Sequence, residues 1–99
     1  MARFDVYRDG SETGLLLDCQ SDLLGHLNTR FVAPLLLQEH APAPAKRLNP
    51  VFSINDRPYV MVTQFAAAIT VRECGSVIMS LAHEDTAIIN ALDMLISGY

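Results

Sequence analysis

Residues 84–99 read Glu-Asp-Thr-Ala-Ile-Ile-Asn-Ala-Leu-Asp-Met-Leu-Ile-Ser-Gly-Tyr, and this stretch contains the one convincing helix pattern of the chain. The aliphatic residues at 88, 89, 92, 95 and 96 fall on one arc at about 100° per residue, the spacing of an amphipathic helix. A polar stripe lies away from that arc and consists of Thr86, Asn90, Asp93 and Ser97. Gly98 is suited to ending a helix. We therefore predict a helix over residues 84–96 whose end either completes the fold or contacts a partner.

The chain before this helix has the pattern of short β-strands. Apolar runs, several of them alternating with polar residues, predict strands over residues 3–7, 15–19, 30–37, 50–54, 58–63 and 69–73, and a further short element over 76–81. Asn55-Asp56-Arg57 predicts a hairpin turn, and the two glycines of residues 9–14 predict another. Short strands followed by one helix favour a small antiparallel barrel or sandwich with the helix packed across it, as one domain over residues 1–99.

Two loops and one proline interrupt these strands. Residues 20–29 are polar apart from Leu23-Leu24, which either fold back on the barrel as a plug or form an exposed contact. Residues 39–46 contain two prolines and predict an exposed loop. Pro34 lacks an N–H group, so its strand should bulge or lie at a sheet edge at that point.

The composition indicates an oligomer. Apolar residues make up 51% of the 99-residue chain and charged residues only 18%, against roughly 25% charged residues in an average soluble domain. A chain of this size has difficulty hiding so much apolar surface, and a two-fold dimer is the simplest way to cover it. Charged residues interrupt every apolar run before it reaches membrane-spanning length. The N-terminus is not a signal peptide, so we expect a cytoplasmic protein.

The charge pattern disfavours nucleic acid as a direct partner. The formal net charge is −4, and the seven basic residues are scattered singly except for Lys46-Arg47. Phosphate contacts from clustered basic residues supply most of the non-specific affinity for nucleic acids. This chain has no such cluster beyond one pair.

The cysteines and histidines predict no metal site. Cys19 and Cys74 lie far apart in apolar, strand-like runs, so we expect two buried, reduced thiols. His26, His40 and His83 have no metal-ligand spacing to each other or to the cysteines. We expect neither a metal nor another cofactor.

Several motifs along the chain resemble one family. They are Leu17-Asp18-Cys19-Gln20-Ser21-Asp22-Leu23-Leu24, Arg30, Pro34-Leu35, Leu48-Asn49-Pro50-Val51, Tyr59, Thr63, Gly75 and Leu81-Ala82-His83. In this order they resemble the CcdB family of bacterial toxins, whose Gln-Ser-Asp and two-aliphatic signature is fairly specific. The resemblance implies a mainly β fold, an SH3-like antiparallel barrel of the CcdB/MazF kind with a C-terminal helix, working as a homodimer.

The resemblance also implies a function in a type II toxin–antitoxin system, with plasmid maintenance as its setting. Toxins of this family bind the A subunit of DNA gyrase, trap it on cleaved DNA and are neutralised by the antitoxin CcdA. They perform no chemistry of their own. Carried over by position, the gyrase-binding residues would be Leu23, Leu24, Asp93, Ile96, Ser97, Gly98 and Tyr99.

The chain departs from the family pattern at the helix end. Ser97 replaces a tryptophan, Tyr99 an isoleucine, Asp93 an asparagine and Ile96 a phenylalanine. A buried tryptophan anchor is typically worth about 2 kcal/mol or more, so its loss would lower affinity roughly 30-fold. Lys46-Arg47 would suit an acidic antitoxin segment, mainly through on-rate and specificity.

Two other functions stay open at this stage. The first is a protein of the same fold that binds antitoxin but has lost or changed its target. The second is a MazF-like endoribonuclease, which would need a general acid–base pair and a cation for phosphate. Its candidates would be Arg30 with His26 or Glu39, although no spacing recommends them.

Overall fold

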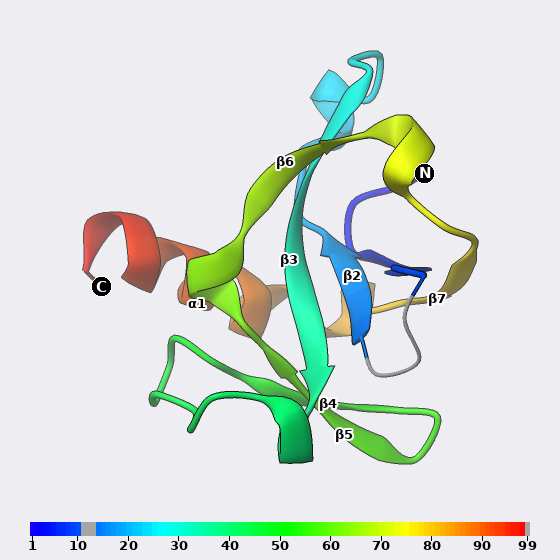
Figure 1. Ribbon diagram of the computed structural model, residues 1–99. Coiled ribbons are helices and arrows are strands. Elements are labelled where there is room, and N and C mark those ends of the chain that lie inside the picture. The colour runs from blue at the N-terminus through cyan, green and yellow to red at the C-terminus, as the bar shows by residue number, and fades with distance from the viewer. Residues whose placement is uncertain (11–13, 99) are drawn as a thin grey trace.

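The computed structural model describes residues 1–10 and 14–98 (Figure 1). The strands are β1 (Asp5–Arg8), β2 (Gly14–Asp18), β3 (Thr29–Leu37), β4 (Val51–Ile54), β5 (Arg57–Met61), β6 (Ala67–Thr70) and β7 (Val77–Ser80). The 3-10 helices are η1 (Asp22–Leu24), η2 (Gln38–His40), η3 (Thr63–Phe65), η4 (Val71–Glu73) and η5 (Ala82–Glu84), and the α-helix is α1 (Asp85–Ser97). The predicted turn over 9–14 falls partly outside the described residues.

The strands form one curled antiparallel sheet. Its order is β4-β5-β3-β2-β1-β7, and β6 pairs with the first half of β3. The curled sheet makes a partly open barrel whose apolar inner face, together with one face of α1, forms the core. The predicted fold class, mainly β and compatible with an SH3-like barrel with a C-terminal helix, is confirmed.

Strand β3 is central, so the prediction of an edge or bulge at Pro34 was wrong. Along one side β3 pairs with β2, and along the other it pairs with β6 over residues 29–32 and with β5 over residues 35–37. The Pro34 carbonyl accepts a hydrogen bond from the Val62 N–H at 2.9 Å on this second side. The backbone N–H and C=O of one residue in an antiparallel strand point toward the same neighbouring strand. The N–H that Pro34 lacks would therefore point to the place where pairing with β6 ends and pairing with β5 begins.

The hairpin between β4 and β5 forms where the sequence predicted it. Asn55 and Asp56 both have positive φ angles, 53° and 63°. A two-residue turn with both φ angles positive matches the twist of the flanking strands, and Asn and Asp tolerate this conformation better than other non-glycine residues.

The strand predicted over residues 69–73 is displaced toward the N-terminus. The pairing of β6 with β3 ends at Thr70. There the Glu73 carboxylate accepts hydrogen bonds from the Thr70 N–H at 2.8 Å and from the Thr70 hydroxyl at 3.1 Å. These contacts turn the chain into η4. Cys74 follows η4 and is only partly buried, so its predicted burial in a strand was wrong, whereas Cys19 is buried as expected.

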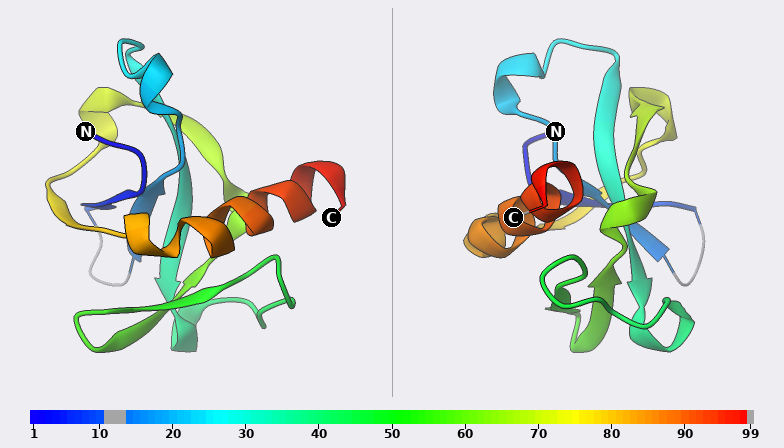
Figure 2. Two further views of the ribbon diagram at one scale, coloured as in Figure 1. Left: turned by 180° about the vertical axis from the view of Figure 1, so that it is seen from behind. Right: turned by 90° about the vertical axis from the view of Figure 1, so that its left-hand side faces the viewer.

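The helix α1 is buried along its first half only. Ile88 and Ala91 are buried in the core, and the C-terminal half projects beyond the sheet (Figure 2). Gly98 ends the helix as predicted, with φ 79° and its N–H bound to the Met94 carbonyl at 3.1 Å. Among the described residues, no helix is long and apolar enough to cross a membrane.

Candidate functional site

A buried polar network lies at the end of β2 and centres on the Asp18 carboxylate. Its Oδ2 accepts hydrogen bonds from the Tyr7 hydroxyl at 2.6 Å and from Arg30 Nε at 2.9 Å, and Arg30 Nη2 completes an ion pair at 2.6 Å. Its Oδ1 accepts a hydrogen bond from the Gln20 N–H at 3.0 Å. Burial and the hydrogen bond to Asp18 raise the pKa of the Tyr7 phenol well above its usual value. The network joins β1, β2 and β3 beneath the loop that carries η1.

This network removes Arg30 from the candidate catalytic residues. Its guanidinium is buried and neutralised by Asp18, so it is not available to a phosphate group. His26 lies before the start of β3 and Glu39 after its end, and a nine-residue strand spans roughly 30 Å at about 3.3 Å per residue. His26 and Glu39 therefore lie at opposite ends of β3, and the buried Arg30 is available to neither of them as a catalytic cation.

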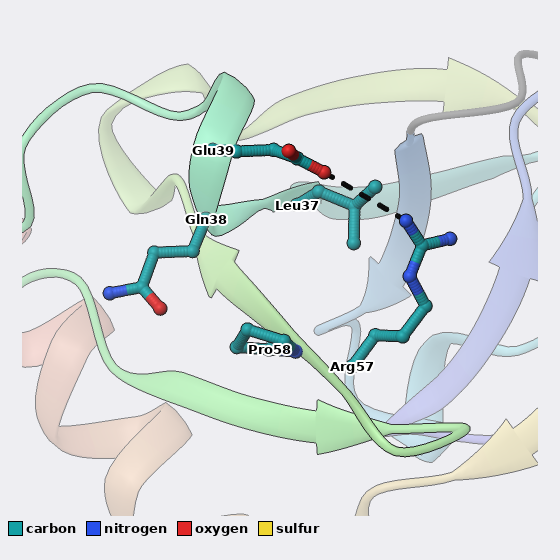
Figure 3. Close-up of a pocket in the computed structure, with 5 residues that line it drawn as sticks. All are labelled: Leu37, Gln38, Glu39, Arg57 and Pro58. Carbon is teal, nitrogen blue, oxygen red and sulfur yellow. Dashed lines mark ion pairs between the residues drawn. The ribbon is translucent and has the colours of Figure 1, made fainter.

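An open hollow of about 420 Å³ lies at the Glu39 end of β3 (Figure 3). It is lined by Leu37, Gln38, Glu39, Arg57 and Pro58. Glu39 and Arg57 face each other across it at 3.8 Å, and both side chains are largely exposed. An exposed ion pair of this kind contributes little energy. Nowhere in the described chain do three His, Cys, Asp or Glu side chains gather as a metal ion would require.

The η1 turn presents two leucines to solvent. The Ser21 hydroxyl accepts a hydrogen bond from the Leu23 N–H at 3.2 Å and caps the turn, and the Asp22 carboxylate accepts one from the Arg3 N–H at 2.9 Å. The Leu23 residue is 88% exposed, and Leu24 is also exposed. Between the two possibilities left open by the sequence, Leu23-Leu24 form an exposed surface and not a plug.

The end of α1 forms a second exposed surface. All four residues of the predicted polar stripe, including Asp93 and Ser97, are exposed. Ile96 is 76% exposed, and Leu95 is exposed beside it. Gly98 is exposed as well, whereas Tyr99 lies outside the described residues.

These candidate residues occupy separate parts of the subunit. The η1 turn lies at one end of the molecule, away from the end of α1, in each view of Figure 2. Lys46 and Arg47 are exposed on the loop between η2 and β4, and this loop lies on the same side as the C-terminal half of α1. The leucine pair and the helix end are therefore two surfaces, not one continuous patch, within a single subunit.

One exposed residue was missed by the sequence reasoning. Phe65 belongs to η3, which packs against α1, and the residue is 58% exposed. Its sequence signal was a single aromatic residue two positions after the predicted strand over 58–63, outside any alternating pattern. Together Phe65, Leu95 and Ile96 give the C-terminal region of the fold an exposed apolar character.

Comparison with known protein families gives a match over nearly the whole chain. The family described as CcdB protein matches residues 3–98, nearly the whole chain. The match spans β1 to the end of α1, so it includes both the η1 turn and the exposed helix end.

Proposed function

Because this chain belongs to the CcdB family, we propose that it binds the A subunit of DNA gyrase and traps gyrase on cleaved DNA. The family consists of the toxins of toxin–antitoxin pairs, so the chain is such a toxin and the proposal concerns its target. The action is docking alone, with no bond made or broken by this chain. It takes place in the cytoplasm, where gyrase works.

The observation that carries the proposal is the exposure of the helix end. A projecting helix terminus with an exposed isoleucine, Ile96, and an exposed polar edge, Asp93 and Ser97, has the mixed character of a protein-binding surface. Leu23 and Leu24 supply a second apolar contact on the η1 turn. In the resemblance drawn from the sequence, these are the positions that contact gyrase.

A homodimer accounts for the remaining apolar surface. Phe65 of η3 and Leu95 of α1 are exposed, and these two elements pack against each other. Exposed apolar groups favour a protein neighbour over water. We assign this surface to a second copy of the chain, since a two-fold dimer would also present two helix ends and two η1 turns to one target. The separation of these surfaces within one subunit is consistent with a site assembled from two copies.

The antitoxin is proposed to reach the loop that carries Lys46 and Arg47. Both residues are exposed, and the loop that carries them lies on the same side as the C-terminal half of α1. An acidic, CcdA-like segment that contacts this loop would be attracted by the pair and would lie beside the target-binding helix end. Such a segment would compete with gyrase for access.

Expression in bacteria tests the proposal. The wild-type protein should arrest growth, an adjacent antitoxin should restore it, and gyrase–DNA cleavage complexes should accumulate. Growth arrest without such complexes would refute gyrase as the target. A gyrase A subunit that resists the toxin should abolish the arrest.

The altered helix end supports a second candidate, a protein that binds antitoxin but no longer poisons gyrase. Ser97 is exposed where the family has a tryptophan, and Asp93 adds an exposed charge. Antitoxin binding without gyrase binding would favour this candidate. The double variant Ser97→Trp, Tyr99→Ile should then gain gyrase inhibition. Thr86→Trp, on the same polar stripe but at the start of α1, is the matched control and should gain none.

A further inference from the structure

The side chain of Gln20 connects the barrel to the η1 turn. Its Oε1 accepts a hydrogen bond from the Phe31 N–H at 2.9 Å, and its Nε2 donates one to the Leu24 carbonyl at 2.9 Å. Its own N–H is bound to Asp18, as described above. Gln20 is only 8% exposed. One buried amide therefore uses both of its ends to join β3 to the turn that presents the leucines.

The η1 turn has few other attachments to the barrel. It is a three-residue 3-10 helix with no buried residue, so apolar packing does not hold it in place. Its remaining contact with another part of the chain among the hydrogen bonds described is the one between Asp22 and the Arg3 N–H. An isolated 3-10 turn is weak by itself. Its conformation therefore depends on these polar contacts.

We propose that Gln20 is a positioning residue of the target-binding surface. By fixing the Leu24 carbonyl to β3, it holds η1 in the conformation in which Leu23 and Leu24 face outward. The inference rests on the proposed function, because the leucines are taken to contact the target. A surface ordered before binding loses less conformational entropy when the complex forms. Without the Gln20 side chain, the η1 turn would have to become ordered when the complex forms, and this would lower the affinity.

The chain offers a matched control in Asn49, a second buried amide. Asn49 is 6% exposed, its Oδ1 accepts from the Ala45 N–H at 2.9 Å, and its Nδ2 donates to the Met61 carbonyl at 3.0 Å. It joins a different loop to the barrel. Gln20→Met and Asn49→Leu each remove a buried amide while keeping side-chain size, so they should perturb overall stability similarly.

Amide hydrogen exchange of the isolated protein tests the attachment directly. The Leu24 N–H is bound to the Ser21 carbonyl at 3.0 Å and the Gly25 N–H to the Asp22 carbonyl at 3.1 Å. Both amides should exchange about 5- to 10-fold faster in Gln20→Met, the factor expected for one lost hydrogen bond, and should be unchanged in Asn49→Leu. Equal exchange of these amides in the two variants would overturn the inference. If Gln20→Met does not fold, Gln20→Asn, which is one methylene too short to reach both partners, replaces it.

Affinity for the purified gyrase A subunit tests the functional half. Gln20→Met should bind about 5- to 10-fold more weakly than Asn49→Leu, because the ordering lost from the free protein must be supplied on binding. Faster exchange with unchanged affinity would overturn the positioning role. If the wild-type protein fails to bind gyrase A, the proposed function fails. The exchange result still decides whether Gln20 holds the turn, and the growth arrest of the two variants then replaces the binding measurement.

Discussion

Replacing Asp18 by asparagine removes the only carboxylate that contacts the buried Arg30 in the described part of the chain. The shape of the side chain is nearly kept, so the perturbation is the loss of a charge and not the opening of a cavity. The Arg30 guanidinium would then remain buried without its ion pair at 2.6 Å. Breaking a buried pair by removing one partner costs about 3–5 kcal/mol.

That cost is a large part of the stability of a small domain. The total free energy of unfolding is about 5–15 kcal/mol for ordinary proteins, and a domain of this length loses about 4–8 °C of melting temperature per kcal/mol. We therefore expect Asp18→Asn to melt at least about 12 °C below the wild type. Thermal unfolding followed by circular dichroism measures the melting temperature, and urea unfolding measures the free energy of unfolding. Both are done at a fixed chain concentration, because the apparent stability of an oligomer depends on concentration.

A triple variant separates the charge from the position. Tyr7→Phe, Asp18→Leu and Arg30→Met together remove every side-chain member of the Oδ2 cluster, and leave no charge unpaired there. Replacing a whole buried ionic cluster by apolar groups is often close to neutral. The triple variant should therefore be more stable than Asp18→Asn. The reasoning would be refuted if Asp18→Asn lowered the free energy of unfolding by less than about 1 kcal/mol. It would also be refuted if the triple variant were no more stable than Asp18→Asn.

Three further predictions follow from exposure, backbone geometry and burial. Phe65 is 58% exposed, and its burial in a two-fold dimer should contribute about 2–3 kcal/mol to the free energy of association. Phe65→Ser should therefore raise the dimer dissociation constant about 30- to 150-fold, as measured by analytical ultracentrifugation. Asn90→Ser is the control and should leave the constant unchanged. Gly98→Ala meets no atom within 4 Å but keeps φ at 79°, so it should lower stability by about 1–2 kcal/mol in thermal denaturation. Burial raises the pKa of Cys19 from 9.0 to about 12. The stability gained from its protonated thiol is complete below pH 9 and is lost between pH 9 and 12; Cys19→Ala should flatten this decline.

The sequence predicted the elements that depend on local patterns. The helix over 84–96 and its end at Gly98 were correct within one residue, because apolar spacing and a glycine that adopts positive φ are local properties. The hairpin at Asn55-Asp56 was correct for the same reason. The candidate surfaces could also be named in advance, because the family signature lies in short segments of the chain.

Other features required the folded chain. Whether Leu23 is a plug or a contact depends on what lies opposite it, and hydrophobicity alone gives both answers. Arg30 was considered as a catalytic cation, but the fold places it against Asp18, twelve positions away in the sequence. Pro34 was expected at a bulge or a sheet edge, but the fold places it in the central strand, where the neighbour of β3 changes from β6 to β5.

Sequence periodicity thus predicted the mainly β fold and the terminal helix, and the resemblance to the CcdB family named the residues expected to contact a partner. Tertiary structure decided which of these are exposed, how Gln20 and Asp18 attach η1 to the barrel, and that η1 and the helix end are separate surfaces. The physical reason is that periodicity records contacts between residues a few positions apart. Exposure and long-range hydrogen bonds depend on which distant segments meet in the folded chain.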